Sequence, residues 1–507
     1  MKAYLLAHDL GTSGNKATLY DLEGRLCASE LCEYETFYPQ PRFVEQNPES
    51  WWEAVCKSTR SLLEKAAVSP GEIAAVSFSG QMMGCLLVDR HGNPLRPSII
   101  WADTRSAAQE EFMLRTVGAE RGYQITGHRL SASYGAAKLL WIRDNEPEIY
   151  QRAYKMLNAK DYIVSRLTGR YVTDYSDASG TNLLDIQRKD WSDELLEAFC
   201  IPRELLPELH ASADIVGTVT PAAAAQTGML PGTPVVLGGG DGSCACVGAG
   251  VAQEGKTYHV LGSSSWISTA SRRPVSDPAM RTFNWIHLDP SLYTPCGTMQ
   301  AAGLSFQWFR NTLCGEELLR GAQLGVSAYR LIDEAVGKSQ PGAGGLLYLP
   351  YLLGERSPRW NLNARGAFVG LQARTTKADM ARSVLEGVGY NLKVILDIFD
   401  EKYPVDQVTV IGGGAKGRVW LQILSDIWQK PLAIPRYREE ATSMGAAVCA
   451  GVGIKAFSGF EAAAELNPPE DLILPRPEYA ERYRALYCIF NQAYEQLRSV
   501  YDSLAKL

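Results

Sequence analysis

The chain lacks any uninterrupted apolar run of 18 or more residues, about the length that a membrane-spanning helix needs. It also lacks an excess of positive charge, because 50 Lys and Arg stand against 56 Asp and Glu, for a net charge of −6. A broad nucleic-acid surface needs the opposite balance to offset phosphate repulsion. We therefore expect neither a membrane nor a nucleic acid among the partners of this protein.

Paired cysteines are scarce as well. The eleven cysteines are an odd number scattered along the chain, and Cys244-Ala245-Cys246 is the one tight pair. No second pair or histidine cluster accompanies it to complete a zinc site. His8 and Asp9 follow the first apolar residues too early for a signal peptide. Reduced thiols in a cytoplasmic protein are the resulting expectation.

Gly-x-x-x-x-Gly-Lys-Ser/Thr occurs once, at residues 250–257, but in the wrong context for a P-loop kinase. A P-loop follows a strand and opens a helix, whereas this segment follows a predicted helix of small residues and leads into a predicted strand. Its 507 residues leave room for two or more domains, and 46% apolar with 21% charged residues is ordinary for a globular protein. Any nucleotide or phosphate site must therefore be built from other motifs.

The first such motif is a glycine-rich turn near the amino terminus. Residues 4–7 are an apolar run that predicts a buried strand, and residues 17–20 predict a second one. The turn region between them contains Gly11, Thr12, Ser13, Gly14 and Lys16. Backbone amides, hydroxyls and one lysine suit a phosphate, and Asp9 just before them suits Mg²⁺. The alternatives are an ordinary glycine-rich hairpin and, for Lys16, a solvated strand residue.

Two further turns follow in the second half of the chain. One has the same strand–turn–strand pattern, and the other follows the apolar run 408–411 and suits a base or ribose. The turn residues are Gly262, Ser263 and Ser264 in the first, and Gly412, Gly413, Gly414 and Ala415 in the second. Two phosphate-type hairpins, one in each half, resemble those of the actin-like ATPases, in which a nucleotide lies between two similar domains.

This resemblance implies an α/β fold of two similar actin-like (ribonuclease H-like) domains that flank a nucleotide cleft. We expect the first domain to cover residues 1–248 and the second residues 249–507. Helices of small residues are expected at 244–252 and 443–451, and they would pair as a close-packed hinge between the domains.

Polar residues follow successive predicted strands of the first half. Gln81 comes after the strand at 73–79 and is followed by Met82 and Met83. Trp101 is the last residue of a strand at 98–101, and Asp103 lies just beyond it. Polar strand ends are typical of a small-molecule site in an α/β fold. A helix cap or turn residue is the alternative for Gln81 and for Asp103.

Asp241 follows another apolar run and is embedded in four glycines. With so few neighbouring side chains, its carboxylate is free to face a cleft. The alternative is an Asx turn, in which the aspartate only binds its own backbone.

One family carries these elements together. Gly366-x-Phe368-x-Gly370-Leu371, Asp379-Met380 and residues 383–386 fit the second signature of the FGGY carbohydrate kinases, and the chain resembles that family over essentially its whole length. The first signature fits more loosely, because Gly135 stands where a small hydroxyl residue or proline is usual.

The resemblance implies transfer of a phosphoryl group from ATP to a sugar with the help of Mg²⁺. Asp241 is then the general base that takes the proton of the sugar hydroxyl. The three glycine turns would bind ATP and Asp9 the metal. The implied sugar pocket is lined by Gln81, Met82, Met83, Trp101, Asp103 and Asp241.

Within the family, the pocket motifs are most similar to those of xylulokinases. Residues 81–84 resemble Gln-Met-His-Gly, and residues 101–105 resemble Trp-Asn-Asp-x-Arg. Met83 replaces the histidine and Ala102 the asparagine, so we expect a different hydroxyl pattern to be recognised. D-xylulose or a similar pentulose is the first expected substrate, and gluconate or another ketose or polyol is the alternative. An actin-like ATPase without a sugar substrate is the alternative from another class. The sequence leaves open whether the chain forms a homodimer.

Overall fold

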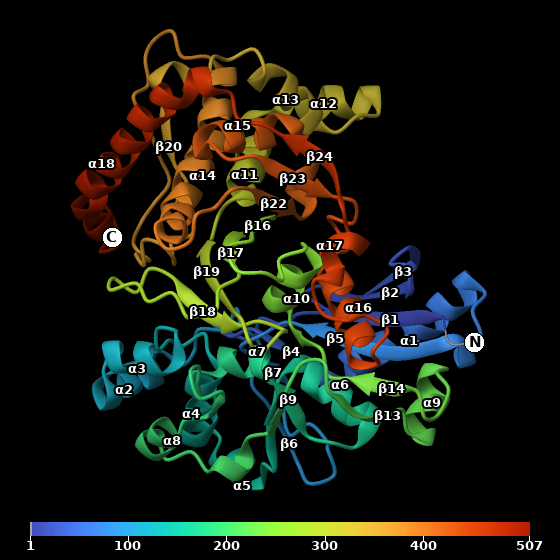
Figure 1. Ribbon diagram of the computed structural model, residues 1–507. Coiled ribbons are helices and arrows are strands. Elements are labelled where there is room, and N and C mark those ends of the chain that lie inside the picture. The colour runs from blue at the N-terminus through green and yellow to red at the C-terminus, as the bar shows by residue number, and fades with distance from the viewer. Residues whose placement is uncertain (1–2) are drawn as a thin grey trace.

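The computed structural model describes residues 3–507 and contains two large sheets of seven strands each, one from each half of the chain. Figure 1 shows them as two lobes: the lower is coloured mainly blue to green and the upper mainly yellow to red. Helices cover the sheets on both lobes, as expected for an α/β protein.

In the first sheet the spatial order of the strands differs from their order along the chain, so the sheet contains crossover connections. Its strands, in spatial order, are β13 (Ile215–Thr218), β14 (Pro234–Val236), β5 (Ile73–Gly80), β1 (Tyr4–Leu10), β2 (Gly14–Asp21) and β3 (Leu26–Glu33), with β15 (Gly239–Gly240) paired to the end of β5.

The second sheet repeats this plan. Its strands are β18 (Phe283–Ile286), β19 (Tyr293–Met299), β17 (Ser265–Thr269), β16 (Thr257–Leu261), β22 (Val408–Ile411), β23 (Leu432–Pro435) and β24 (Pro469–Ile473). From β19 to β24 the successive pairs are antiparallel, antiparallel, parallel, parallel and antiparallel. The series from β3 to β13 has the same directions. The hairpins β1–β2 and β16–β17 therefore occupy equivalent places, which confirms the predicted fold class.

Helix α1 (Pro48–Ala66) packs against β2 and β3 of the first sheet and begins at a local side-chain cap. The Asn47 side chain accepts a hydrogen bond from the backbone N–H of Glu49 at 3.1 Å, and Pro48 takes the first helical position. A helix from the second half, α16 (Ala441–Gly453), covers β1 and β5. Because helices cover the sheet, β5 is buried along its whole length.

The helix α10 (Asp241–Gly248) crosses α16 with almost no space between the two backbones. A Cβ atom on Gly445 would overlap the carbonyl oxygen of Cys244, and one on Gly248 would overlap that of Ala441. The predicted pairing of two small-residue helices is thus confirmed. The first of them begins three residues earlier than predicted, at Asp241, and ends before Gly250, whose φ is +77°.

The remaining helices surround these elements. In the first half they are α2 (Ala107–Val117), α3 (Ala119–Thr126), α4 (Gly135–Asn145), α5 (Pro147–Arg152), α6 (Ala159–Thr168), α7 (Tyr175–Ala178), α8 (Asp193–Phe199) and α9 (Pro221–Thr227). In the second half they are α11 (Gly303–Leu313), α12 (Gly315–Leu324), α13 (Ala328–Val336), α14 (Lys377–Asp400), α15 (Arg418–Trp428), α17 (Ala462–Leu466) and α18 (Ala480–Leu504). None of the helices within residues 3–507 has both the length and the apolar character needed to cross a membrane.

Short strand pairs complete the structure. They are β4 (Glu45–Gln46) with β7 (Ser98–Ile99), β6 (Leu86–Val88) with β8 (Lys155–Leu157), β9 (Val172–Asp174) with β12 (Glu208–His210), β10 (Leu184–Asp185) with β11 (Asp190–Trp191), and β20 (Leu347–Leu349) with β21 (Ala367–Val369). A 3-10 turn, η5 (Gly413–Lys416), links β22 to α15.

Candidate active site

The first glycine turn is a tight hairpin at the tip of β1 and β2. The N–H of Gly11 donates to the carbonyl of Gly14 at 3.0 Å, and a Cβ on Gly14 would lie 2.8 Å from the carbonyl oxygen of Cys32 on β3. Ser13 is exposed at the tip. Lys16 reaches across to the second half, where its Nζ donates to the carbonyl of Glu439 at 3.1 Å. The turn is thus shaped by its glycines, and Lys16 joins it to the segment before α16.

The second and third turns meet each other in the upper lobe. In the second turn, the N–H of Gly262 donates to the carbonyl of Ser264 at 3.1 Å. In the third, Gly412 has a φ of +93°, and a Cβ on Gly414 would overlap the side chain of Leu261 at the end of β16. Gly413 has no atom within 4 Å of the place where a side chain would begin. The structure therefore brings together two turns that lie about 150 residues apart in sequence.

Asp9 lies on β1, next to Ser79 on the parallel strand β5. Its Oδ1 accepts a hydrogen bond from the Ser79 hydroxyl at 2.9 Å. Burial raises the pKa of the Asp9 carboxyl, while the Ser79 hydrogen bond and the charge of Lys16 act in the opposite direction. A half-buried carboxylate with little compensation favours a cation beside it.

Asp241 begins α10 directly after β15, whose Gly239 pairs with Ser79. Since Ser79 also pairs with Asp9, the two carboxylates lie at the ends of the two strands that flank β5 in one sheet. Burial, followed by the charge of Asp9, raises the pKa of Asp241 to about 7. Its Oδ1 accepts a hydrogen bond of 2.7 Å from the N–H of Gly242. A carboxyl with a pKa near neutrality is well matched to proton transfer.

A buried ionic cluster lies behind Asp241. The N–H of Gly240 donates to the hydroxyl of Ser176 at 3.0 Å, and that hydroxyl donates to Asp174. Asp174 also accepts from the Ser212 hydroxyl at 2.8 Å and pairs with Lys160 at 2.9 Å. Burial alone would lower the pKa of Lys160, but the surrounding carboxylates outweigh it and hold this pKa well above the usual value. The residue preceding Asp241 is therefore anchored to a fully buried charged group.

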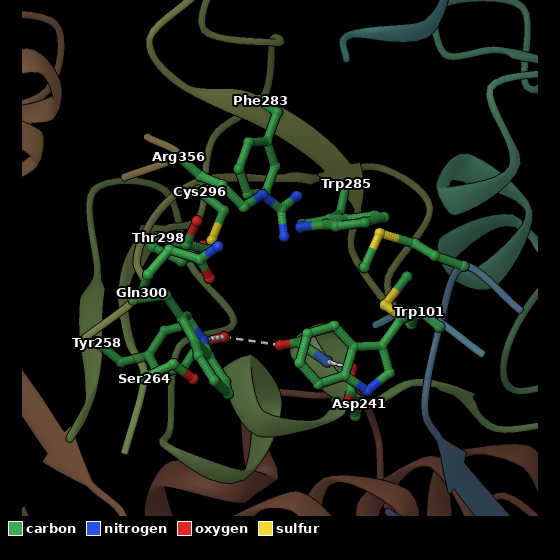
Figure 2. Close-up of a pocket in the computed structure, with 15 residues that line it drawn as sticks. Trp101, Asp241, Tyr258, Ser264, Phe283, Trp285, Cys296, Thr298, Gln300 and Arg356 are labelled. Atoms are coloured by element: carbon green, nitrogen blue, oxygen red, sulfur yellow. Dashed lines mark hydrogen bonds between the residues drawn. The ribbon is translucent and has the colours of Figure 1, made fainter. Parts of the chain in front are cut away.

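Asp241 lies at one side of a cavity of about 170 Å³, which Figure 2 shows among the side chains that line it. The cavity has aromatic and sulfur-containing walls with a few polar groups among them. It is lined by Met82, Met83, Trp101, Asp241, Gly242, Tyr258, Ser264, Trp266, Ser268, Phe283, Trp285, Cys296, Thr298, Gln300 and Arg356. An apolar pocket with a few placed polar groups is the usual form of a small-molecule site.

Four of the six residues predicted for the sugar pocket lie in this lining: Met82, Met83, Trp101 and Asp241. Trp101 also donates from Nε1 to the Thr12 hydroxyl at 2.8 Å, which links the cavity to the first glycine turn. Met83 has a left-handed backbone, with φ of +62°. Its carbonyl accepts a hydrogen bond of 2.7 Å from the buried Lys138, a cation whose pKa burial lowers to about 7.

Gln81 and Asp103 lie outside the lining. The carboxylate of Asp103 accepts from the N–H of Arg105 at 2.9 Å and pairs with that residue's guanidinium at 2.6 Å, which are the contacts of the turn residue that the sequence left as an alternative. Gln81 donates to the side chain of Gln46 at 2.7 Å, and Gln46 donates to the carbonyl of Thr12 at 2.6 Å. Gln81 therefore supports the first turn through Gln46. Direct sugar binding by Gln81 or Asp103 stays a prediction.

The second half of the chain supplies most of the other lining residues, which the sequence reasoning missed. Phe283 and Trp285 lie on β18, and Cys296 and Thr298 on β19. Each pair is two residues apart, so both members project from the same face of a strand. The spacing in the sequence could have indicated a shared strand face, but nothing in the sequence places this hairpin beside Asp241.

Arg356 and Gln300 are fixed in the lining by Glu355. One oxygen of this buried carboxyl accepts from the backbone N–H of Gln300 at 2.9 Å and from that of Arg356 at 3.0 Å. The other accepts from the Asn391 side chain at 2.9 Å, and burial raises the pKa of Glu355 to about 8. Figure 2 shows the Arg356 guanidinium pointing into the cavity.

A magnesium ion fits beside Asp9, on the evidence of the charges. The negative charge of Asp9 raises the pKa of Asp241, so a divalent cation at Asp9 would relieve an unfavourable pair. Within residues 3–507 there is no group of three or more His, Cys, Asp or Glu side chains that could hold a metal by itself. Mg²⁺ is commonly bound through one or two carboxylates together with substrate phosphates. Asp9 near a phosphate-type turn matches that mode.

Comparison with known proteins identifies the class. Residues 4–248 match the N-terminal domain of the FGGY family of carbohydrate kinases, and residues 257–454 match its C-terminal domain. The chain belongs to this family, so it is an ATP-dependent carbohydrate kinase.

Individual relatives carry two different names. The chain is 33% identical over 503 residues to a xylulose kinase of Bacillus subtilis, with 99% of this chain and 98% of that protein covered. It is 30% identical over 507 residues to a gluconokinase of the same organism, with 100% and 98% covered.

The similar solved structures likewise include both gluconate kinases and xylulose kinases. A gluconate kinase from Lactobacillus acidophilus matches with a TM-score of 0.92 and 26% identity, covering 99% of both chains. A xylulose kinase from Rhodospirillum rubrum matches with a TM-score of 0.90 and 28% identity, covering 98% of this chain and 100% of that one. These similarities establish the fold and the class of reaction and leave the sugar open.

Proposed function

We propose that the protein transfers the γ-phosphoryl group of ATP to a hydroxyl of a small ketose, with D-xylulose as the first substrate to test. One observation supports this most strongly: a carboxyl with a pKa of about 7, Asp241, lines an aromatic cavity and lies one strand away from the carboxylate of Asp9. The names of several relatives, including the B. subtilis xylulose kinase, favour D-xylulose.

In the proposed reaction Asp241 acts as the general base. A sugar hydroxyl is too weak an acid to attack ATP unaided, so its proton must leave as the new bond forms. One oxygen of Asp241 is held by the N–H of Gly242, which leaves Oδ2 to accept that proton. The hydroxyl oxygen forms a bond to the γ-phosphorus while the bond from this phosphorus to the β–γ bridging oxygen breaks. The products are the sugar phosphate, ADP and one proton.

The glycine turns would position the nucleotide. Backbone amides and hydroxyls of residues 11–14 and 262–264 are the candidate contacts for the phosphates, and residues 412–415 those for adenosine. When bound, Mg²⁺ neutralises charge on the phosphates, and Asp9 is the residue that would hold it. Lys16, which already contacts the Glu439 carbonyl, would add a positive charge near the nucleotide.

The cavity would hold the sugar between aromatic faces. Three tryptophan rings would face the carbon-bound hydrogens of the sugar: those of Trp101, Trp266 and Trp285. These contacts would orient the sugar hydroxyl towards Asp241. Met83 contributes an apolar contact where a hydrogen-bonding residue would read a hydroxyl. We infer that this position sets the preference among sugars.

Closure of the two lobes about the crossing of α10 and α16 would exclude water from this space. Water that reached the γ-phosphoryl group could replace the sugar, and closure suppresses that loss of ATP. The contact between Gly248 and Ala441 gives the two helices a fixed crossing point about which the lobes could turn.

Gluconate is the second candidate, and Arg356 favours it. The guanidinium lines the cavity that contains Asp241, and its partner Glu355 contacts it only through the backbone N–H. A carboxylate at one end of an aldonate would complement this cation, with a hydroxyl at the other end near Asp241. D-xylulose is neutral and gives Arg356 only uncharged oxygen acceptors.

A coupled assay of ADP release tests these alternatives. D-xylulose, other pentuloses, hexuloses, polyols and gluconate are compared at equal ATP and Mg²⁺, with a reaction lacking sugar as the control. The highest kcat/KM for D-xylulose supports the first proposal, and the highest for gluconate supports the second. ADP release that is independent of every sugar would contradict both and indicate an ATPase of the actin-like class.

Asp9→Ala tests the metal assignment in the same assay. We expect Asp9→Ala to lose magnesium-dependent turnover, whereas Lys16→Ala loses it only in part. Full turnover of Asp9→Ala at low Mg²⁺ would remove Asp9 from the metal site.

A further inference from the structure

Asp333 on α13 carries a carboxyl without a partner. Its Oδ1 is completely buried, and no hydrogen-bond donor reaches it among the described residues. Burial is the sole cause that raises the pKa of this group, to about 6, so no neighbouring charge compensates for its loss of water. A buried acceptor without a donor is costly, and its presence in a folded protein calls for an explanation. A ligand that places a donor on the other oxygen of this carboxyl, Oδ2, is one such explanation.

The position of Asp333 indicates which ligand. A Cβ atom built on Gly417 would lie 3.9 Å from Oδ2 of Asp333. Gly417 directly follows η5 and precedes α15, so the carboxyl lies beside the third glycine turn. In that turn Gly413 has open space in front of it, as a surface that receives a flat group requires.

Helix packing also connects the helix of Asp333 to the second glycine turn, at residues 262–264. The ring of Phe306 on α11 lies 5.0 Å from that of Tyr329 on α13 and 5.7 Å from that of Trp420 on α15. The first residue of α11, Gly303, donates from its N–H to the carbonyl of Gly262 at 2.9 Å. The second turn, the third turn and Asp333 therefore belong to one packed unit of three helices.

We propose that Asp333 recognises the base of the nucleotide, by accepting a hydrogen bond from the 6-amino group of adenine. This inference rests on the proposed use of ATP at the three glycine turns. Adenine presents an N–H donor at position 6, whereas hypoxanthine and guanine present a carbonyl oxygen that a carboxylate repels. A hydrogen bond to a charged acceptor changes affinity by roughly 10- to 100-fold.

The test compares binding of ADP and IDP, both with Mg²⁺, by titration calorimetry. Wild type is expected to prefer ADP by about 10- to 100-fold. Asp333→Asn has nearly the same shape, but its amide can donate to the oxygen at position 6, so the preference should shrink to a few-fold. The control is Glu334→Gln on the same helix, an exposed residue that pairs with Arg330 at 3.5 Å and should keep the wild-type ratio.

Three outcomes would overturn the proposal. Equal binding of ADP and IDP by wild type would do so without any variant. Equal weakening of both nucleotides in Asp333→Asn would also exclude recognition at position 6. The third is that Asp333→Asn weakens ADP but leaves 2′-deoxy-ADP unaffected, because a ribose hydroxyl would then be the donor. These measurements need no sugar, so an enzyme that phosphorylates none of the sugars tested but keeps the Asp333-dependent preference would contradict only the proposed function.

Discussion

The hydroxyl of Ser176 accepts a hydrogen bond of 3.0 Å from the backbone N–H of Gly240, the residue before Asp241. The same hydroxyl donates to Asp174, which pairs with the buried Lys160. The backbone that presents the candidate base is therefore held from behind by a charged cluster. None of these supporting residues lines the cavity in front of Asp241.

Ser176→Ala should loosen Asp241 more than it loosens the fold. Loss of the hydroxyl leaves the Gly240 N–H without its partner, and we expect kcat to fall roughly tenfold with little change in KM for ATP. Ser212→Ala is the matched control, because Ser212 donates to the same Asp174 oxygen without touching Gly240. Steady-state kinetics and thermal unfolding of both variants check this. An equal fall of kcat in the two variants would show that the effect is only structural.

Asp241→Asn should bind ATP and sugar with nearly wild-type affinity and lose about 10²- to 10⁴-fold in kcat. The amide keeps the shape of the side chain and can still accept from the Gly242 N–H, but it cannot take a proton. Calorimetric binding and sugar-dependent ADP release measure the two effects separately. Turnover within a few-fold of wild type would refute the assignment of Asp241 as base.

The raised pKa of Asp241 also has a consequence for stability. The native state keeps this proton up to about pH 7, whereas the unfolded chain releases it near pH 4. Because the native state binds more protons in that window, this group lowers the free energy of unfolding as pH rises from about 4 to about 7. Asp241→Asn removes the effect, so its gain in Tm over wild type should be larger at pH 8 than at pH 5. A gain that is the same at both pH values would contradict the raised pKa.

Met83→His should improve the use of D-xylulose relative to other sugars. A buried donor matched to a substrate hydroxyl discriminates more strongly than an apolar contact does. Histidine also tolerates the left-handed backbone found at this position, where φ is +62°. Relative kcat/KM values over a sugar panel are the measurement. No change in the relative values would mean that residue 83 does not contact the sugar.

Gly445→Ala should destabilise the protein by about 1–3 kcal/mol, because the added methyl group would overlap the Cys244 carbonyl and force α10 and α16 apart. Gly315→Ala is the control: it lies at the start of α12 with nothing within 4 Å of the new Cβ, so it should leave Tm unchanged or raise it. Chemical denaturation of both variants gives the comparison. Equal stability of Gly445→Ala and wild type would show that the helices can separate freely.

Features set by local sequence could be predicted. The hairpin at Gly11 was predicted because its turn residues lie within four positions of one another. The structure shows two helix caps of equally short range, at Asn47 and at Thr376 with Asp379. The similarity of the two halves also followed from local patterns, since each half carries its own strand–turn–strand signal. These interactions form wherever the chain places the segment.

The cavity wall and the partner of Asp103 could not be predicted, since both depend on tertiary packing. The hairpin β18–β19 carries Phe283 and Trp285, which line the cavity with Trp101, a residue about 180 positions earlier in the sequence. Asp103 is a carboxylate at the end of a strand, as a ligand-binding residue would be, but it forms an ion pair with Arg105, two residues away. Sequence alone does not tell which of two acceptable partners a carboxylate takes.

The packing of α16 on β1 and β5 bears on how the chain folds during synthesis. Residues 441–453 leave the ribosome more than 350 residues after β5, so until then β1 and β5 lack the helix that packs on them in the finished protein. Long-range contacts of this kind form slowly and leave hydrophobic surface exposed to other chains. We therefore expect the amino-terminal half, although it matches a family domain, to complete the burial of β1 and β5 only when a helix made near the end of translation packs onto them.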